Sequence, residues 1–202
     1  MTAAGVLLPA PLTALASAPS AGYKPTAEED AFLEDLTRRG CEYFWDHAHP
    51  ATGQVLDRAR AFGPDNHTMA SIAATGFGLT ALCIADARGY YPRAQIRERV
   101  RRTLEFHWTR LPQEHGFYYH FSDAATGFTS RGSELSSIDT ALLLAGVLMC
   151  RTYFRDAEIQ DLATKIYEGV DWPWMLDNGL TFSMGWFPDS GFLPARWNTY
   201  SE

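Results

Sequence analysis

The stretch Met69-Ala-Ser-Ile-Ala-Ala-Thr-Gly-Phe-Gly-Leu-Thr-Ala-Leu-Cys-Ile-Ala85 carries no charged side chain. A second stretch, Ile138-Asp-Thr-Ala-Leu-Leu-Leu-Ala-Gly-Val-Leu-Met-Cys150, would be apolar on every side as a helix, and Asp139 is its only charged residue. We expect helices over about 68–88 and 133–154, and we expect Gly76 to let helices approach closely. A helix that is apolar on all its faces has to be surrounded by protein, so both are predicted to be inner helices.

The segments on either side of these two are amphipathic. Apolar residues recur at helical spacing, with charged residues on the opposite face, over about 26–47, 93–111 and 157–175. The first of these helices opens with the capping box Thr26-Ala27-Glu28-Glu29. Outer and inner helices therefore alternate along the chain. This order is typical of helical hairpins in two concentric layers, so we predict an all-α fold of the α/α toroid or α-solenoid kind.

A short turn segment precedes each predicted inner helix. Its glycines are Gly53, Gly127 and Gly191, which lie 74 and 64 residues apart. Residues 116–121 and 181–187 read as short strands of β-hairpins beside these turns. Three copies of one junction would place the hairpins on one rim, where the N-termini of the inner helices converge. A third inner helix is expected to begin at Asn198.

Two acidic residues stand out at the starts of the inner helices. Asp139 lies one turn inside an apolar helix, where an unpaired carboxylate costs several kcal/mol. It is either satisfied by Ser136 or Thr140, or it contacts substrate. Glu134 either complements the helix dipole in a first turn or lies in a cleft. The local pattern leaves both pairs of interpretations open.

Composition limits the partners and the compartment. The net charge of −7 argues against nucleic acid as the main partner. No run approaches the roughly 20 apolar residues of a membrane span. Residues 1–25 read as a signal-like or disordered arm, which favours a periplasmic or secreted protein over a cytoplasmic one. The three cysteines are expected to be buried free thiols. The spacing of His47 and His49 does not suit a metal site, and we expect no metal and no cofactor.

Three motifs resemble the bacterial glycoamylase-like family, which includes endo-β-1,2-glucanases. They are Phe44-Trp-Asp-His-Ala-His-Pro-Ala-Thr-Gly53, Ser130-Arg-Gly-Ser-Glu-Leu-Ser-Ser-Ile-Asp-Thr-Ala-Leu-Leu-Leu-Ala-Gly146 and Gly185-Trp-Phe-Pro-Asp-Ser-Gly-Phe-Leu-Pro-Ala-Arg-Trp-Asn-Thr-Tyr-Ser-Glu202. The resemblance covers about 31–202. It implies an (α/α)6 toroid with short β-hairpins on one rim, of which residues 26–202 would be the N-terminal half. It also implies hydrolysis of β-linked glucan, in particular β-1,2-glucan, with inversion.

The resemblance also implies roles for individual residues. Glu202 is similar to the family's general acid, while Glu134 and Asp139 are similar to acidic residues at the rim of the sugar subsites. The expected sugar contacts are Arg131, Tyr119, Trp197 and Tyr200. The family's partner carboxylate lies in the second half of the toroid. We therefore expect a glucan oligosaccharide or polysaccharide as ligand, no activity from this chain alone, and the missing C-terminal half as a separate partner chain.

Two other functions fit the same rim. A carbohydrate-binding or assembly module would use these residues without chemistry. A polysaccharide lyase on an α/α toroid would need several basic residues in the mouth for a uronate substrate, and only Arg131 and Arg196 are obvious there.

Overall fold

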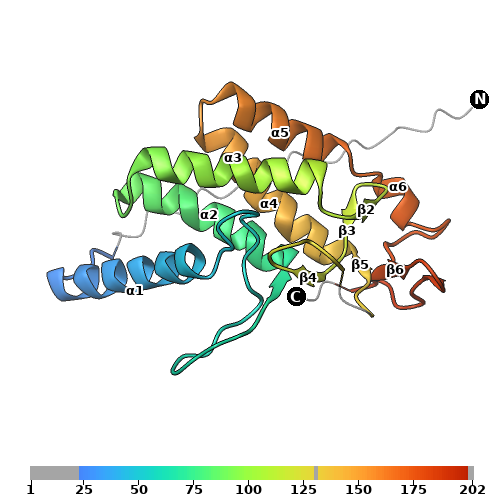
Figure 1. Cartoon of the computed structure of the whole chain (residues 1–202), viewed down its shortest axis with the longest axis horizontal. Helices are drawn as coiled ribbons and strands as arrows, with labels where there is room; N and C mark the ends of the chain where they lie inside the picture. The colour runs from blue at the N-terminus through green and yellow to red at the C-terminus, as the bar shows by residue number, and fades with distance from the viewer. Residues whose placement is uncertain (1–22, 130–131, 200–202) are drawn as a thin grey trace, which may run out of the picture.

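The structure is a computed structural model that describes residues 23–129 and 132–199 (Figure 1). Most of the arm predicted over residues 1–25 lies outside the described residues. The long helices are α1 (Ala27–Asp46), α2 (Ile72–Arg88), α3 (Arg93–Thr109), α4 (Ser137–Tyr153) and α5 (Ala157–Glu168), followed by one turn, α6 (Trp172–Met175). No helix in these two described ranges is both long and apolar enough to cross a bilayer.

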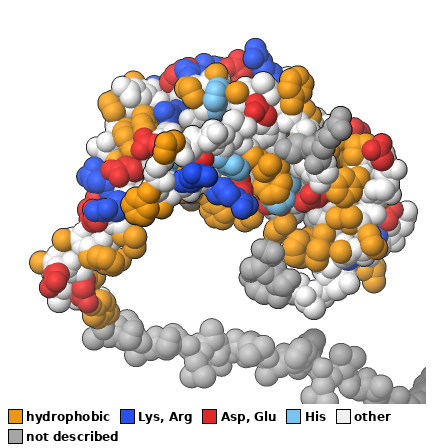
Figure 2. All heavy atoms as spheres, turned by 60° about the horizontal axis from the view of Figure 1, so that its bottom comes forward, with side chains coloured by type: hydrophobic (Ala, Val, Ile, Leu, Met, Phe, Trp, Pro, Cys, Tyr) orange, Lys and Arg blue, Asp and Glu red, His pale blue; other side chains and the backbone are white. Residues whose placement is uncertain are grey.

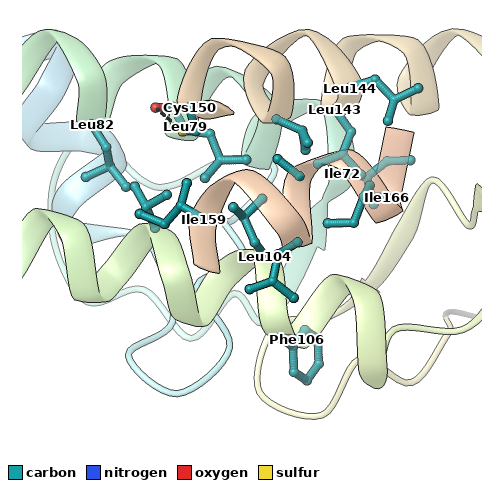
Figure 3. Packing of buried hydrophobic residues seen from close by; sticks show 14 of the residues in the cluster. Ile72, Leu79, Leu82, Leu104, Phe106, Leu143, Leu144, Cys150, Ile159 and Ile166 are labelled. Atoms are coloured by element: carbon teal, nitrogen blue, oxygen red, sulfur yellow. Dashed lines mark hydrogen bonds between the residues drawn. The ribbon is translucent and has the colours of Figure 1, made fainter. Parts of the chain in front are cut away.

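The helices form the predicted layers. Helices α2 and α4 pack against each other more extensively than any other pair, α1 lies against α2, and α5 lies against both α4 and α3 (Figure 1). Buried side chains from α2, α3, α4 and α5 meet in one core (Figure 3); examples are Leu79, Leu104, Leu143 and Ile159. The alternation of outer and inner helices is therefore confirmed, whereas the described residues include short strands as well and do not themselves close a toroid.

The two inner helices touch at their backbones. A Cβ atom added to Gly146 of α4 would lie 2.0 Å from the carbonyl oxygen of Gly76 in α2. A Cβ added to Gly76 would in turn lie 2.4 Å from the carbonyl oxygen of Leu142. Real Cβ atoms do not approach other atoms so closely, and backbone atoms cannot rotate out of the way. The prediction that Gly76 permits a close helix approach is therefore confirmed.

Short strands precede both inner helices. β1 (Met69–Ser71) leads into α2 and pairs with β4 (Phe121–Asp123), and β5 (Leu135–Ser136) leads into α4 and pairs with β6 (Gly185–Phe187). The remaining strands, β2 (Gln113–Glu114), β3 (Phe117–Tyr118) and β7 (Gly191–Phe192), complete the hairpins. Each inner helix is thus joined to the hairpin that follows it in the chain, and the hairpins share one rim as predicted.

The repeated turn glycines share one backbone conformation. Gly53, Gly127 and Gly191 have φ angles of 73°, 77° and 77°. This left-handed region is favourable for glycine and strained for most other residues. Two of the three turns are also tightly packed, because a Cβ on Gly53 would overlap Thr103 and a Cβ on Gly127 would crowd Phe106.

Several predicted helix boundaries are wrong. The helices expected from about 68 and 133 begin at Ile72 and Ser137, because strand pairing holds the preceding residues extended until Ser71 and Ser136 cap the helices. The helix expected to reach 175 ends at Glu168. The chain then turns and starts α6 with Asp171, whose side chain caps Trp174 N–H at 3.2 Å.

Both inner helices leave one stripe of side chains exposed in the described structure. On α2 the stripe includes Phe77 and Ile84, which are 54% and 40% exposed and lie two turns apart. On α4 it includes Met149, which is 45% exposed. The opposite faces of these helices are buried against their neighbours. The expectation that protein surrounds the inner helices therefore holds for only part of their circumference.

Candidate active site

A histidine held between two carboxylates is the polar centre of the rim. The Nδ1 atom of His120 lies 3.0 Å from Oε1 of Glu134, and its Nε2 atom lies 3.4 Å from Oδ1 of Asp139. The three side chains are between 13% and 25% exposed. They are sheltered but reachable from solvent, as a ligand site requires.

Strand pairing brings these three residues together. His120 lies between β3 and β4, and its backbone N–H donates to the carbonyl oxygen of Glu134 at 2.9 Å. Its own carbonyl accepts from the backbone N–H of Ile72, the first residue of α2, at 3.2 Å. Glu134 immediately precedes β5, and Asp139 lies in the first turn of α4. The cluster therefore forms where the second hairpin contacts the starts of both inner helices.

Asp139 has two kinds of partner. The Ser136 hydroxyl donates to Oδ2 of Asp139 at 2.5 Å and accepts from the Asp139 backbone N–H at 3.2 Å. The alternative partner, Thr140, instead accepts from the backbone N–H of Tyr118. The interpretation that Ser136 satisfies Asp139 is therefore confirmed, while the second oxygen of this carboxylate faces His120. Asp139 is thus bound by the helix-capping Ser136 and is also part of the cluster with His120.

Glu134 does not lie in the first turn of a helix. It precedes β5, so the dipole interpretation of this residue is wrong and the cleft interpretation fits its position. Strand β5 pairs with β6 and delays the start of α4 until Ser137. A pattern of local helix signals cannot anticipate that pairing.

The cluster favours the charged form of His120 and the ionised form of Glu134. Burial by itself disfavours the imidazolium, but the hydrogen bond to Glu134 and the charges of Asp139 and Glu134 outweigh it and raise the pKa of His120. Burial likewise disfavours the Glu134 carboxylate, but the hydrogen bond and charge of His120 outweigh it and lower the pKa of Glu134. His120 and Glu134 therefore stabilise each other's charged forms.

This geometry does not suit an acid/base pair for inversion. One oxygen of Glu134 and one of Asp139 lie within 4.8 Å of each other and of a His120 nitrogen. Inverting glycosidases separate their two carboxyl groups by about 6.5–9.5 Å, and their general acid needs a raised pKa. The pKa of Glu134 is lowered instead. Both carboxylates can accept hydrogen bonds, and their place at a sugar subsite stays a prediction.

Trp197 reaches the same helix start. Its indole N–H donates to the hydroxyl of Ser137 at 2.9 Å, and that hydroxyl donates to the carbonyl of Ser183 at 2.8 Å. The half-buried ring is thus fixed two residues along α4 from Asp139. Tyr119, by contrast, packs against the hydrophobic core, and burial raises the pKa of its hydroxyl. The structure brings Trp197 to the site, while the part-buried Tyr119 packs on the core beside His120 and its sugar contact stays a prediction.

Arg196 is occupied by its own hairpin. Its guanidinium donates to the carbonyls of Leu176 and Thr181 at 2.9 and 2.8 Å and pairs with Asp177 at 3.0 Å. It therefore holds the third hairpin closed, which weakens the lyase alternative. The other expected site residues, Arg131, Tyr200 and Glu202, lie outside the described residues, and their roles stay predictions.

One face of the molecule is hollowed. Figure 2 shows a concave face on which basic, acidic and histidine side chains gather along the wall, with hydrophobic side chains on one flank. A separate hollow of about 240 Å³ opens between the end of α1 and the turn after β4, and its polar lining includes His47, His49 and His67. The rim therefore offers a polar surface with aromatic groups nearby, a combination that suits sugars.

No protein-family model matches the chain. The chain is 26% identical over 191 residues to an exo β-1,2-glucooligosaccharide sophorohydrolase of Parabacteroides distasonis, a match that covers 89% of this chain and 24% of that protein. This curated relative is thus about four times as long as the region that the two proteins share.

Solved structures share the fold. An endo-β-1,2-glucanase from Chitinophaga pinensis superposes with a TM-score of 0.71 and 25% identity, over 80% of this chain and 41% of that one. A β-1,2-glucanase from P. distasonis superposes with a TM-score of 0.71 and 25% identity, over 84% of this chain and 25% of that one. A proposed glucoamylase from Bacteroides caccae superposes with a TM-score of 0.70 and 27% identity, over 80% of this chain and 42% of that one. The chain therefore resembles β-1,2-glucan hydrolases and glucoamylase-like proteins, as its motifs predict, and it spans less than half of their length.

Proposed function

We propose that this chain is part of a glycoside hydrolase that acts on β-1,2-glucan and that the His120–Glu134–Asp139 cluster binds the sugar. The cluster itself is the observation that carries the proposal, because it places two carboxylate acceptors on a rim next to a fixed indole. The similarity to β-1,2-glucan hydrolases on the same scaffold supports the choice of ligand.

The chemistry of the cluster suits a glucose unit. Ionised carboxylates accept hydrogen bonds from sugar hydroxyls, and such charge-assisted bonds are stronger than neutral ones. The His120 ring lies between the two acids and fixes the direction of one oxygen of each. The ring of Trp197, anchored at its N–H, supplies an apolar surface for the C–H face of a pyranose.

An inverting mechanism with Glu202 as general acid is our proposal for the chemical step. It rests on the resemblance of the last motif, Trp197-Asn-Thr-Tyr-Ser-Glu202. Glu134 and Asp139 lack the separation that inversion needs, so they do not form the acid/base pair with each other, and we propose that the general base lies in the second half of the toroid, as the resemblance implies. We therefore expect the 202-residue chain to bind glucan without hydrolysing it.

Titration calorimetry with β-1,2-glucooligosaccharides tests the proposal, with product analysis of the same samples. Glu134→Gln and Asp139→Asn should each weaken binding by about tenfold, because each removes one charge-assisted hydrogen bond. Glu105→Gln, an exposed change on α3, serves as the matched control and should leave binding unchanged. No heat with the unaltered chain, or equal heat with β-1,3-glucan oligosaccharides, would overturn the proposal.

A carbohydrate-binding module without catalysis is the second candidate. The spacing of Glu134 and Asp139 favours it, since these two carboxylates lack the separation of an inverting acid/base pair. Heat without product from this chain agrees with both candidates. Release of glucan products would exclude the binding module and would also contradict the expectation that this chain is inactive alone.

A further inference from the structure

Two buried thiols meet across the interface of the inner helices. The Sγ atoms of Cys83 in α2 and Cys150 in α4 lie 3.7 Å apart. Cys83 is 4% exposed and Cys150 is fully buried. The Cys150 thiol also donates to the carbonyl of Leu79 at 3.5 Å, and Figure 3 shows this region of the core. Either thiol can be the donor in the contact between the two sulfur atoms.

The close helix approach puts the pair within reach of a covalent bond. The contact between Gly76 and Gly146 fixes the spacing of the two helices, and the cysteines lie one to two turns further along each of them. A disulfide needs a sulfur separation of about 2.05 Å, so each sulfur would have to move by less than about 1 Å. The third thiol, Cys41, is buried elsewhere and donates to the carbonyl of Ala81 at 3.6 Å.

We propose that Cys83 and Cys150 form a disulfide that cross-links the two inner helices when the chain folds in the presence of a low-molecular-weight disulfide. One thiol loses its proton and attacks a sulfur of the oxidant RSSR, which releases RS⁻ and leaves a mixed disulfide. The second thiol then loses its proton, attacks the protein sulfur of that mixed disulfide and displaces another RS⁻. The two protons leave with the two thiolates as RSH. The two cysteines are oxidised, and RSSR is reduced to two RSH.

The folded environment determines when this bond can form. The hydrogen bond with Cys83 and burial together raise the pKa of the Cys150 thiol, so little thiolate exists once the helices have packed. Exchange is therefore confined to folding or to opening of the α2–α4 interface. Both cysteines lie toward the C-terminal ends of their helices, away from the rim, so the cross-link leaves the proposed glucan site unchanged.

The test uses the full chain, refolded from denaturant in a buffer of reduced and oxidised glutathione. Peptide mapping without reduction then identifies the linked pair. A random chain would favour Cys41–Cys83, whose ends are 42 residues apart, over Cys83–Cys150, whose ends are 67 apart, by about twofold from loop-closure entropy. We expect the opposite order, with Cys83–Cys150 as the main product and Cys41 as a free thiol.

Stability gives a second readout. The cross-link should raise the Tm by on the order of 5–10 °C relative to the reduced chain. Cys41→Ser should keep both the linked peptide and the shift, whereas Cys150→Ala should lose both. The proposal is wrong if all three thiols remain free after oxidative refolding, or if a disulfide that contains Cys41 predominates. The mapping result needs no variant, so it stands even if a substituted chain fails to fold.

Discussion

Replacing His107 should remove much of the acid sensitivity of the fold. This histidine lies in α3 and is 1% exposed. Its Nδ1–H donates to the carbonyl of Thr103 at 2.7 Å, while its Nε2 atom is buried with no hydrogen-bond partner among the described residues. A proton added to Nε2 would be a buried charge without a partner. Burial therefore lowers the pKa of His107 to about 4, against the opposing effect of the Thr103 hydrogen bond.

The sign and size follow from linkage. The unfolded chain binds a proton at this histidine near pH 6.5, and the folded chain binds it only near pH 4. The free energy of unfolding is therefore highest above pH 6.5 and falls as the pH drops from there to about 4. Integrating over this window gives a loss of roughly 2 kcal/mol at pH 5 and roughly 3 kcal/mol at pH 4 from this single residue.

Urea unfolding followed by circular dichroism at pH 7.5, 6, 5 and 4 measures the effect. Carboxylates also titrate over part of this range, so the quantity to compare is the pH dependence of the unaltered chain minus that of the variant. Between pH 7.5 and pH 5, the free energy of unfolding should fall by roughly 2 kcal/mol less in His107→Phe than in the unaltered chain. His107→Gln should show the same difference and serves as the second variant if the larger phenylalanine ring does not fit. Parallel pH profiles for the unaltered chain and both variants would refute the reasoning.

Other predictions use the same unfolding and binding measurements. Gly146→Ala should lower the free energy of unfolding by about 3 kcal/mol, because its Cβ would overlap the backbone of Gly76. The control Gly40→Ala, whose Cβ meets nothing within 4 Å, should be neutral or stabilise the fold by up to about 1 kcal/mol. Equal effects of the two substitutions would contradict the close packing at Gly146. Ser136→Ala should cost about 1 kcal/mol through loss of the helix cap, and an unchanged urea midpoint would count against it. Because the pKa of His120 is raised, the stabilising effect of this residue is complete below about pH 6.5 and is lost as the pH rises through the folded pKa. This pH dependence has the opposite sign to that of His107. Glucan binding should weaken over the same rise, and calorimetry should find this dependence absent in His120→Gln.

Much of the helical layer could be predicted from the sequence, because its cause is local. Side-chain periodicity decides which face of a helix is buried, and the uncharged stretch from Met69 to Ala85 has no polar face to present to water. The helix starts could not be predicted in this way. Ser136 is extended because it pairs with Gly185, which lies far away in the sequence.

The residues of the site, too, could be predicted from the sequence only in part. Asp139 could be predicted because a carboxylate inside an apolar helix is conspicuous in the sequence itself, whereas Glu134 stood out by its place ahead of an inner helix and by the family resemblance. His120 could not, because nothing near it indicates its partners. Its position follows from the pairing of its backbone with Glu134, which no local pattern encodes. Arg196 shows the reverse error, since a basic residue that looks available for substrate is used to close a hairpin.

The exposed stripes on the inner helices affect how this chain has to be studied. Phe77, Ile84 and Met149 offer solvent an apolar surface in the native state. An environment-sensitive dye such as anilinonaphthalene sulfonate should therefore fluoresce on the fully folded chain. Thermal-shift curves read with such a dye would begin bright and could show no transition in a sample that melts cooperatively. Melting temperatures for the disulfide and glycine experiments should instead come from circular dichroism, recorded at more than one protein concentration so that self-association is separated from unfolding.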